Sequence, residues 1–235
     1  MKLLITSAAS DLGQTLAATF SSKYQVRLTD LVDVESDLEF VRSDLGHGEA
    51  TNELVRGIDT IIHLAALPHV LLSESCDAAN LEIDFLTRCT YNLLLASAAE
   101  NVSHVIYAST LGLMEQYDED WTVTECWRPL PTTDACTLSK HLGEFVCREF
   151  AREGLINITC LRLGALVTEA KVSNQPFDAA WLELKDAVHV FECALNAPAA
   201  KWEIFHVQSE YLDSRFSILK AKDSLKFNPQ FSFER

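Results

Sequence analysis

Residues 6–13, T-S-A-A-S-D-L-G, join a short apolar run to a helical pattern and could bind a phosphate group. A strand, a tight turn and a helix start direct unpaired N–H groups and the positive end of the helix dipole at one spot. The pyrophosphate of a dinucleotide would fit there. The hydroxyls of Ser7 and Ser10 could donate to that phosphate, or Ser10 could instead cap the helix. Gly13 allows the helix to pack closely against the strand.

Asp30 ends the second apolar run, seventeen residues after Gly13. A carboxylate at this position can accept hydrogen bonds from both ribose hydroxyls of NAD. The same charge would repel the additional phosphate of NADP, and the first loop holds no arginine to receive that group. NAD is therefore the expected coenzyme and NADP the less favoured one. The alternative is that Asp30 is only a turn residue.

The elements that must position this loop are short apolar runs that alternate with amphipathic stretches of helix length. The apolar runs, expected to be strands, span residues 2–6, 24–29, 39–42, 59–63, 102–109, 156–163 and 204–207. The helical patterns span residues 11–20, 51–56, 83–99, 133–152 and 184–196. This alternation predicts βαβ units, and hence an α/β fold of the Rossmann type with a doubly wound parallel sheet.

The regular alternation loosens after about Gly164. We therefore predict a dinucleotide-binding Rossmann domain in residues 1–164 and a small C-terminal substrate or cap region in residues 165–235, packed on the same domain. In open α/β sheets ligands bind at the carboxyl ends of the strands. The cap is expected to cover these ends.

Composition narrows the expected partners and compartment. The 235 residues include 19 Lys and Arg against 34 Asp and Glu, a net charge of −15. This charge would repel a nucleic acid or an anionic membrane, and no apolar run is long enough to span a bilayer. The seven cysteines are scattered, without the C-x-x-C spacing of a metal or redox site. We expect no metal, reduced thiols and a cytoplasmic location.

Four further motifs follow the loop in order along the chain. They are V-I-Y-A-S-T (residues 105–110), C-T-L-S-K-H-L-G-E (136–144), L-R-L-G (161–164) and L-K-F-N-P (225–229). Together with the loop, in which serine replaces two glycines of the pattern T-G-x-x-G-x-x-G, they resemble extended short-chain dehydrogenases/reductases over essentially the whole chain. Within these proteins the resemblance is to the NAD-dependent epimerase/dehydratase group, closest to its uronate dehydrogenase-like branch.

The resemblance implies roles for individual residues. Lys140 would hold the nicotinamide ribose, and Thr110 would hydrogen-bond the reacting oxygen of the substrate. Asp44 would lie at the adenine edge, and the small residues after His63 would let the backbone pack against the coenzyme. His63 itself is expected to be a structural histidine at a strand end. The residues implied for NAD binding are Ser7, Ser10, Asp11, Leu12, Asp30, Asp44, Leu45, Leu64, Ala65, Ala66 and Lys140.

Cys136 stands where the family has its catalytic tyrosine. A thiol beside Lys140 and a cationic nicotinamide could ionise and move a proton, directly or through water. Alternatively, Cys136 is a small buried residue where the tyrosine was lost. Other departures are Leu86 near the family's helix asparagine and Leu111 at the asparagine after the hydroxyl residue. Just after the L-R-L-G motif, only Lys171 offers the positive charge that would grip a sugar carboxylate.

Two functions follow from the resemblance. The first is an NAD-dependent oxidoreductase, or an epimerase-like enzyme, acting on a sugar-like or other small hydroxyl or carbonyl substrate, with Thr110, Cys136 and Lys140 as catalytic residues. The second is a catalytically degenerate member that serves as a dinucleotide- or metabolite-sensing or partner-binding module. The second is motivated by departures in both the phosphate loop and the proton-transfer residues.

The family commonly forms dimers through two long helices, here the helical patterns of residues 83–99 and 133–152. Both patterns carry surplus apolar residues, among them Phe145, Val146 and Phe150. A homodimer through these helices is expected. The alternative is that the apolar residues face the sheet.

Overall fold

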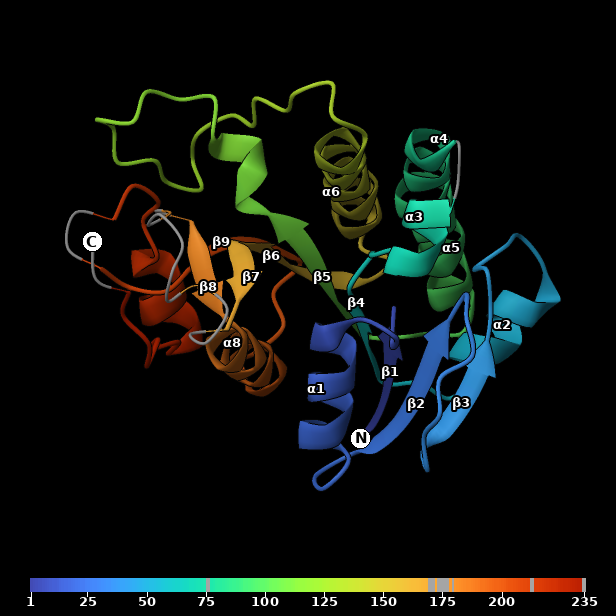
Figure 1. Ribbon diagram of the computed structural model, residues 1–235. Coiled ribbons are helices and arrows are strands. Elements are labelled where there is room, and N and C mark those ends of the chain that lie inside the picture. The colour runs from blue at the N-terminus through green and yellow to red at the C-terminus, as the bar shows by residue number, and fades with distance from the viewer. Residues whose placement is uncertain (75–76, 169–171, 173–177, 179, 212–213, 234–235) are drawn as a thin grey trace.

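Seven parallel strands form the central sheet within the residues that the computed structural model describes, 1–74, 77–168, 172, 178, 180–211 and 214–233 (Figure 1). Their order is β3-β2-β1-β4-β5-β6-β9. The chain starts near the middle of the sheet and reaches first one edge and then the other, which is the doubly wound arrangement. The predicted α/β fold of the Rossmann type is confirmed.

The strands coincide closely with the predicted apolar runs. The four strands in the middle of the sheet are almost wholly buried, as expected for parallel strands covered on both faces. The edge strand β3 is mostly exposed. The bounds are β1 Lys2–Thr6, β2 Gln25–Asp30, β3 Glu39–Arg42, β4 Thr60–His63, β5 His104–Thr110, β6 Asn157–Leu163 and β9 Trp202–Val207.

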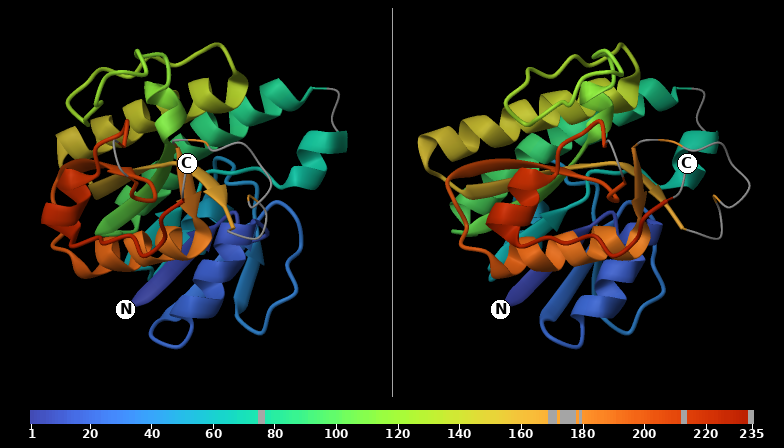
Figure 2. Two further views of the ribbon diagram at one scale, coloured as in Figure 1. Left: turned by 60° about the vertical axis from the view of Figure 1, so that its left-hand side comes forward. Right: turned by 90° about the vertical axis from the view of Figure 1, so that its left-hand side faces the viewer.

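Helices cover both faces of the sheet (Figures 1 and 2). Successive side chains of a strand point to opposite faces, and β1 shows this directly. Leu3 and Ile5 pack into the core shared with α1 (Asp11–Phe20) and α8 (Leu184–Asn196), whereas Leu4 packs into the core on the other face. That second face is covered by α2 Glu49–Val55, α5 Thr90–Ala99 and α6 Ala135–Glu153.

Helix α6 has clear signals at both ends. The Asp134 carboxylate accepts the backbone N–H of Thr137 at 2.9 Å and caps the start of the helix. Gly154 ends it in the left-handed region with φ of 77°, which glycine adopts without steric cost. The predicted helix over residues 133–152 is therefore confirmed to within two residues. Cys136 and Lys140 lie one turn apart in its first half.

The predicted helix over residues 83–99 differs from the structure. It begins earlier, as α4 (Ala78–Ile83), and passes through a π-helical turn at Asp84–Cys89 before α5. A wider turn displaces the apolar positions, so a period of 3.6 residues describes only part of this segment. Several short elements were not predicted, namely α3 His69–Glu74, the 3-10 turn Leu111–Met114, β7 Ala165–Val167 and β8 Trp181–Glu183. A short helix was predicted after the last strand, and the structure has a π-helical turn there at Ala221–Leu225.

Residues beyond Gly164 contribute to both the sheet and its covering layer. Strand β9 pairs with β6 in the main sheet, and α8 packs beside α1. Strands β7 and β8 form a separate two-stranded sheet. The division into residues 1–164 and 165–235 stays a prediction. Within the described residues, no helix combines the length and apolarity needed to cross a bilayer.

Candidate functional site

A cavity of about 680 Å³ opens at the carboxyl ends of the central strands. Its walls come from the turn between β1 and α1, the loop after β4, the end of β5, the first half of α6 and the residues that follow β6. Ligands bind at this edge in doubly wound sheets. Eight of the predicted site residues line it together: Ser10, Asp11, Leu12, Leu64, Ala66, Thr110, Cys136 and Lys140.

The turn after β1 keeps a glycine-like backbone although its first glycine position is serine. Ser7 has φ of 54°, in the left-handed region that non-glycine residues seldom adopt. Its hydroxyl oxygen accepts the backbone N–H of Ala66 at 3.0 Å, which ties the turn to the loop after β4. Serine at this position therefore adopts a backbone conformation that glycine adopts without steric cost, and its side chain adds a contact to the loop after β4.

Ser10 caps helix α1, so the capping interpretation is confirmed. Its Oγ accepts the backbone N–H of Gly13 at 3.0 Å and donates to the carbonyl of Ser7 at 2.7 Å. Gly13 is required in this turn, because a Cβ there would lie 2.5 Å from the Ser7 carbonyl oxygen and 2.9 Å from the Ala8 Cα. The tight turn and the helix start that suit a pyrophosphate are thus both present.

Asp30 is a buried carboxylate that holds the turn against β2. It is 4% exposed, and its Oδ2 accepts the Ala9 N–H at 2.8 Å while Oδ1 accepts the Leu31 N–H at 2.6 Å. Oδ1 also accepts the Val32 N–H at 3.4 Å, so Oδ2 is the oxygen that can accept a further hydrogen bond from a ribose hydroxyl. Arg42 donates to the Leu31 carbonyl, and its guanidinium is paired with Asp33 at 3.2 Å. Asp33 therefore competes with any phosphate for this exposed cation.

Five predicted coenzyme residues do not line the cavity together with those eight: Ser7, Asp30, Asp44, Leu45 and Ala65. Asp44 is exposed, and its Oδ1 accepts the Gly46 N–H at 2.9 Å. Leu45 and Ala65 are buried and have positive φ, in the loops after β3 and β4. Their roles toward a coenzyme stay predictions.

Lys140 is the buried cation of the site. Its Nζ donates to the carbonyls of Leu64 and Ala108 at 2.8 and 2.7 Å, which joins the ends of β4 and β5. The residue is 8% exposed, and burial lowers the pKa of its ammonium to about 8. Lys140 is therefore mostly protonated at neutral pH. Two of its three N–H donors are used by the protein, and one remains for a ligand.

Thr110 ends β5 and caps the turn that follows. Its Oγ1 accepts the Gly112 N–H at 3.0 Å. This bond fixes the position of the oxygen and leaves the O–H to donate to a ligand in the cavity.

Cys136 is exposed and lines the cavity, so the interpretation as a buried residue is wrong. Loss of surrounding water raises the pKa of its thiol, an effect larger than the lowering caused by Lys140. Lys140 alone therefore does not bring the pKa of the thiol below its usual value, and ionisation beside a cationic nicotinamide stays a prediction. Cys136 carries its proton at neutral pH.

His63 is a satisfied structural histidine, as expected. Thr90 Oγ1 donates to the Leu86 carbonyl at 2.7 Å, so it accepts from His63 Nε2 at 2.9 Å. His63 Nδ1 then accepts from Thr6 Oγ1 at 2.9 Å. Burial, together with the charge of Lys140, lowers the pKa of His63 to about 3. The ring stays neutral and links β1, β4 and the start of α5.

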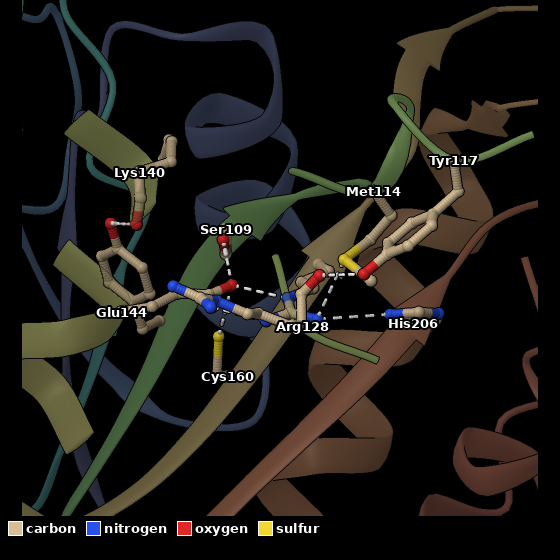
Figure 3. A network of polar contacts seen from close by, with 10 residues as sticks. Ser109, Met114, Tyr117, Arg128, Lys140, Glu144, Cys160 and His206 are labelled. Carbon is tan, nitrogen blue, oxygen red and sulfur yellow. Dashed lines mark hydrogen bonds and ion pairs between the residues drawn. The ribbon is translucent and has the colours of Figure 1, made fainter. Parts of the chain in front are cut away.

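A buried ion pair joins α6 to β6, and no role was predicted for it from the sequence (Figure 3). Arg162 donates from Nε and Nη2 to the two carboxylate oxygens of Glu144 at 2.8 and 2.7 Å, and the side chains are 2% and 6% exposed. Ser109 also donates to Glu144, at 2.6 Å. Because Ser109 lines the cavity and precedes Thr110, this network connects β5, β6 and α6 beneath the site.

Several lining residues were missed. The loop after β4 contributes Leu67, Pro68, His69 and Val70, and the end of β6 leads to Gly164 and Leu166. No motif marks the first group. The only available signal was position, because the loop follows a strand whose carboxyl end meets the cavity. Lys171 lies outside the described residues.

Comparison with known proteins identifies the family. The sequence profile described as the NAD dependent epimerase/dehydratase family matches residues 4–182, well over half of the chain. The chain belongs to this family. The resemblance stated from the motifs is confirmed, and the family's coenzyme, NAD, is the one predicted.

Similar members of the family include sugar dehydrogenases. A uronate dehydrogenase of Pseudomonas syringae pv. tomato is 26% identical over 226 residues, which cover 92% of this chain and 78% of that protein. An NAD-dependent glucose-6-phosphate dehydrogenase of Haloferax volcanii is 24% identical over 257 residues, covering 99% and 96%. A solved structure of a mutated uronate dehydrogenase matches with a TM-score of 0.82 at 26% identity, covering 98% and 82%.

Proposed function

We propose that this family member is an NAD-dependent oxidoreductase, or an epimerase-like enzyme, that acts on a sugar-like or other small hydroxyl or carbonyl substrate. The observation that carries the proposal is that Thr110, Cys136 and Lys140 line the same cavity as the start of α1. A coenzyme at the helix start and a substrate at the hydroxyl, thiol and ammonium groups would then be neighbours. The dehydrogenase relatives support the coenzyme and the sugar-like substrate.

The residues present fit NAD. The start of α1, with Ser10, Asp11 and Leu12, would hold the pyrophosphate, Asp30 the adenine ribose and Lys140 the nicotinamide ribose. When bound, NAD supplies hydride acceptance or donation. The remaining residues proposed to contact it are Ser7, Asp44, Leu45, Leu64, Ala65 and Ala66.

Each of the three proposed catalytic residues, Thr110, Lys140 and Cys136, would have a separate role. Thr110 donates its O–H to the reacting oxygen, because its own oxygen is held by Gly112. Lys140 uses its third N–H for a hydroxyl of the coenzyme. Cys136 is protonated, so it can give a proton to an oxygen during reduction but is a poor base for oxidation.

The charge and polarity of the cavity lining also restrict the class of substrate. Among its described lining residues, only Lys140 and His69 can carry positive charge, and Lys140 is engaged by two carbonyls. Leu67, Val70 and Leu166 make much of the wall apolar. We propose a substrate with less negative charge than a uronate.

A second candidate function is a catalytically degenerate member that senses a dinucleotide or metabolite. The protonated, short side chain of Cys136 favours it, because a positioned acid or base must reach the reacting oxygen. Both functions need the coenzyme site, and they differ in turnover.

Calorimetric titration with NAD and NADP tests the coenzyme site. NAD is expected to bind more tightly than NADP, because the Asp30 carboxylate is held at the end of β2 and Asp33 competes for Arg42. Lys140→Met should weaken NAD binding by about tenfold to a hundredfold through loss of a charged donor. Lys222→Met, an ion-paired lysine outside the cavity, is the control. Absence of any NAD binding would contradict the proposal.

Cys136→Tyr tests whether only the proton donor is missing. The substituted side chain would enter an existing cavity, since Cys136 is exposed there. The change is expected to create or raise reductase activity on a panel of aldoses, ketoses and uronates, measured by NADH absorbance. Cys126→Tyr, at an exposed cysteine that does not line the cavity, is the control. NAD binding without any gain would favour the sensing function.

We also propose a homodimer through α5 and α6. Phe150 is buried, so it faces the interior, but Tyr91 and Leu95 of α5 and Leu142 of α6 are 47%, 39% and 36% exposed. Light scattering is expected to give twice the chain mass of 26.2 kDa. A Leu95→Asp, Leu142→Asp variant should be monomeric, whereas Leu219→Asp, at a 66% exposed leucine elsewhere, should not. A monomeric wild-type protein would remove the claim.

A cytoplasmic location is proposed as well. The described cysteines, six of the seven, are all free thiols, and three of them are buried. Free buried thiols are typical of a reducing compartment. Fractionation of cells with a specific antibody would test this.

A further inference from the structure

A second cavity, of about 370 Å³, lies beside α6 and shares no lining residue with the coenzyme cavity. Its walls come from residues 125–129, α6, β6 and β9. Figure 3 shows part of this region around Glu144. The lining residues used below are Trp127, Arg128, His141, Phe145, Arg148 and Trp202.

The cavity has surplus positive charge in an acidic protein. Its lining holds three arginines against two glutamates: Glu144 is paired with Arg162, and Glu125 accepts the backbone N–H of His206 at 2.9 Å but keeps its charge. Arg128 is exposed, and its guanidinium has no ion pair within the described part of the chain. Arg148 lies 5.1 Å from the ring of Phe145 and has one 3.5 Å contact to Glu149. Arg128 therefore remains for an anion, and Arg148 can bind the same anion with the N–H groups that Glu149 does not occupy.

An unused polar atom lies at the same place. Nδ1 of His141 is buried and has no hydrogen-bond partner among the described residues. Burial lowers the pKa of His141, and the charges of Arg162, Arg148 and Arg128 lower it further against the effect of Glu144. His141 is thus neutral at pH 7, and a buried polar atom without a partner is costly unless a ligand supplies one.

The remaining walls are flat. Trp127 is held by ring contacts to Tyr117 and Trp121, with centroids 4.8 and 5.4 Å apart. Trp202 lines the cavity from β9. Fixed aromatic faces favour a planar, apolar ligand body because they lose little conformational freedom on binding.

We propose that this cavity binds a small organic anion, a carboxylate or phosphate attached to a flat ring. Arg128 and Arg148 bind the anionic group, His141 supplies a further hydrogen bond, and the ring packs between Trp127 and Trp202. This inference does not depend on the proposed function, because it concerns a separate cavity.

The test is titration of the full-length protein with phenyl phosphate, benzoate and inorganic phosphate, followed by calorimetry and tryptophan fluorescence. One site per chain is expected for phenyl phosphate or benzoate, and the preferred probe identifies the anionic group. Arg128→Gln together with Arg148→Gln should weaken that binding by about tenfold or more. Arg152→Gln is the matched control, since Arg152 is an exposed α6 arginine paired with Glu149 outside the cavity.

Four outcomes would overturn the proposal. They are equal affinity for inorganic phosphate, unchanged affinity in the double variant with native melting temperature, loss of binding when NAD is present, and no binding by any probe. If no probe binds and the Arg128→Gln, Arg148→Gln variant no longer self-associates, the cavity is instead part of the contact with a second copy of the chain.

Discussion

Arg162→Met is expected to lower the free energy of unfolding by about 3–5 kcal/mol, because it leaves Glu144 buried without its cation. Arg162 and Glu144 form two hydrogen bonds, and their side chains are 2% and 6% exposed. The carboxylate would keep only the hydroxyl of Ser109 and a weak contact to Cys160. Urea unfolding followed by circular dichroism would measure the loss.

A paired replacement separates the buried charge from lost packing. Arg162→Met with Glu144→Leu removes both charges, and this variant should recover most of the stability lost in Arg162→Met alone. Arg152→Met breaks an exposed pair with Glu149 on the same helix and should change stability by less than about 1 kcal/mol. If the double variant is as unstable as the single one, the ion pair contributes through shape rather than charge.

Acid is expected to destabilise the fold steeply, because three buried histidines stay neutral in the native state. Burial lowers the pKa of His63 and of His206 to about 3. The charge of Lys140 adds to the effect at His63, and the charge of Arg162 adds to the effect at His206. Burial also lowers the pKa of His104 to about 4. The unfolded chain binds these protons near pH 6.5, so their contribution to stability is complete above 6.5 and is lost as the pH falls towards 4.

The expected slope is about 1.4 kcal/mol per pH unit for each histidine, and about 4 kcal/mol per pH unit together between pH 5.5 and 4.5. Urea unfolding at pH 7.5, 6.5, 5.5 and 5.0 would give the slope. His104→Gln should lower the slope by about a third, and His47→Gln, at an exposed histidine, should leave it unchanged. Equal slopes in wild type and His104→Gln would show that His104 does not resist protonation.

The phosphate loop shows which structural features can be predicted from the local sequence pattern. A strand, a tight turn and a helix were predictable for residues 2–20, because apolar periodicity and a helix cap act within a few residues. The cap made by Ser10 is such a local contact, but the contact made by Ser7 was not predictable. Ser7 meets Ala66, 59 positions away, so its partner exists only after β1 and β4 pair.

For Cys136, the position could be predicted from the sequence but the protonation state could not. Its position one turn before Lys140 was evident from spacing, but its protonation depends on water lost to neighbouring elements. Lys140 is likewise defined by the carbonyls of Leu64 and Ala108, at the ends of two different strands. Whether nearby charge or lost solvation dominates is a property of packing.

The sequence by itself determined the Rossmann-type fold, the family resemblance and eight of the residues that meet at the coenzyme cavity, because strand and helix periods and short motifs are local. Tertiary structure alone decided the exposure of Cys136, the buried pair of Glu144 and Arg162 and the cationic cavity beside α6. These depend on desolvation and on contacts between residues far apart in the chain, which become defined only when the sheet and its helices pack.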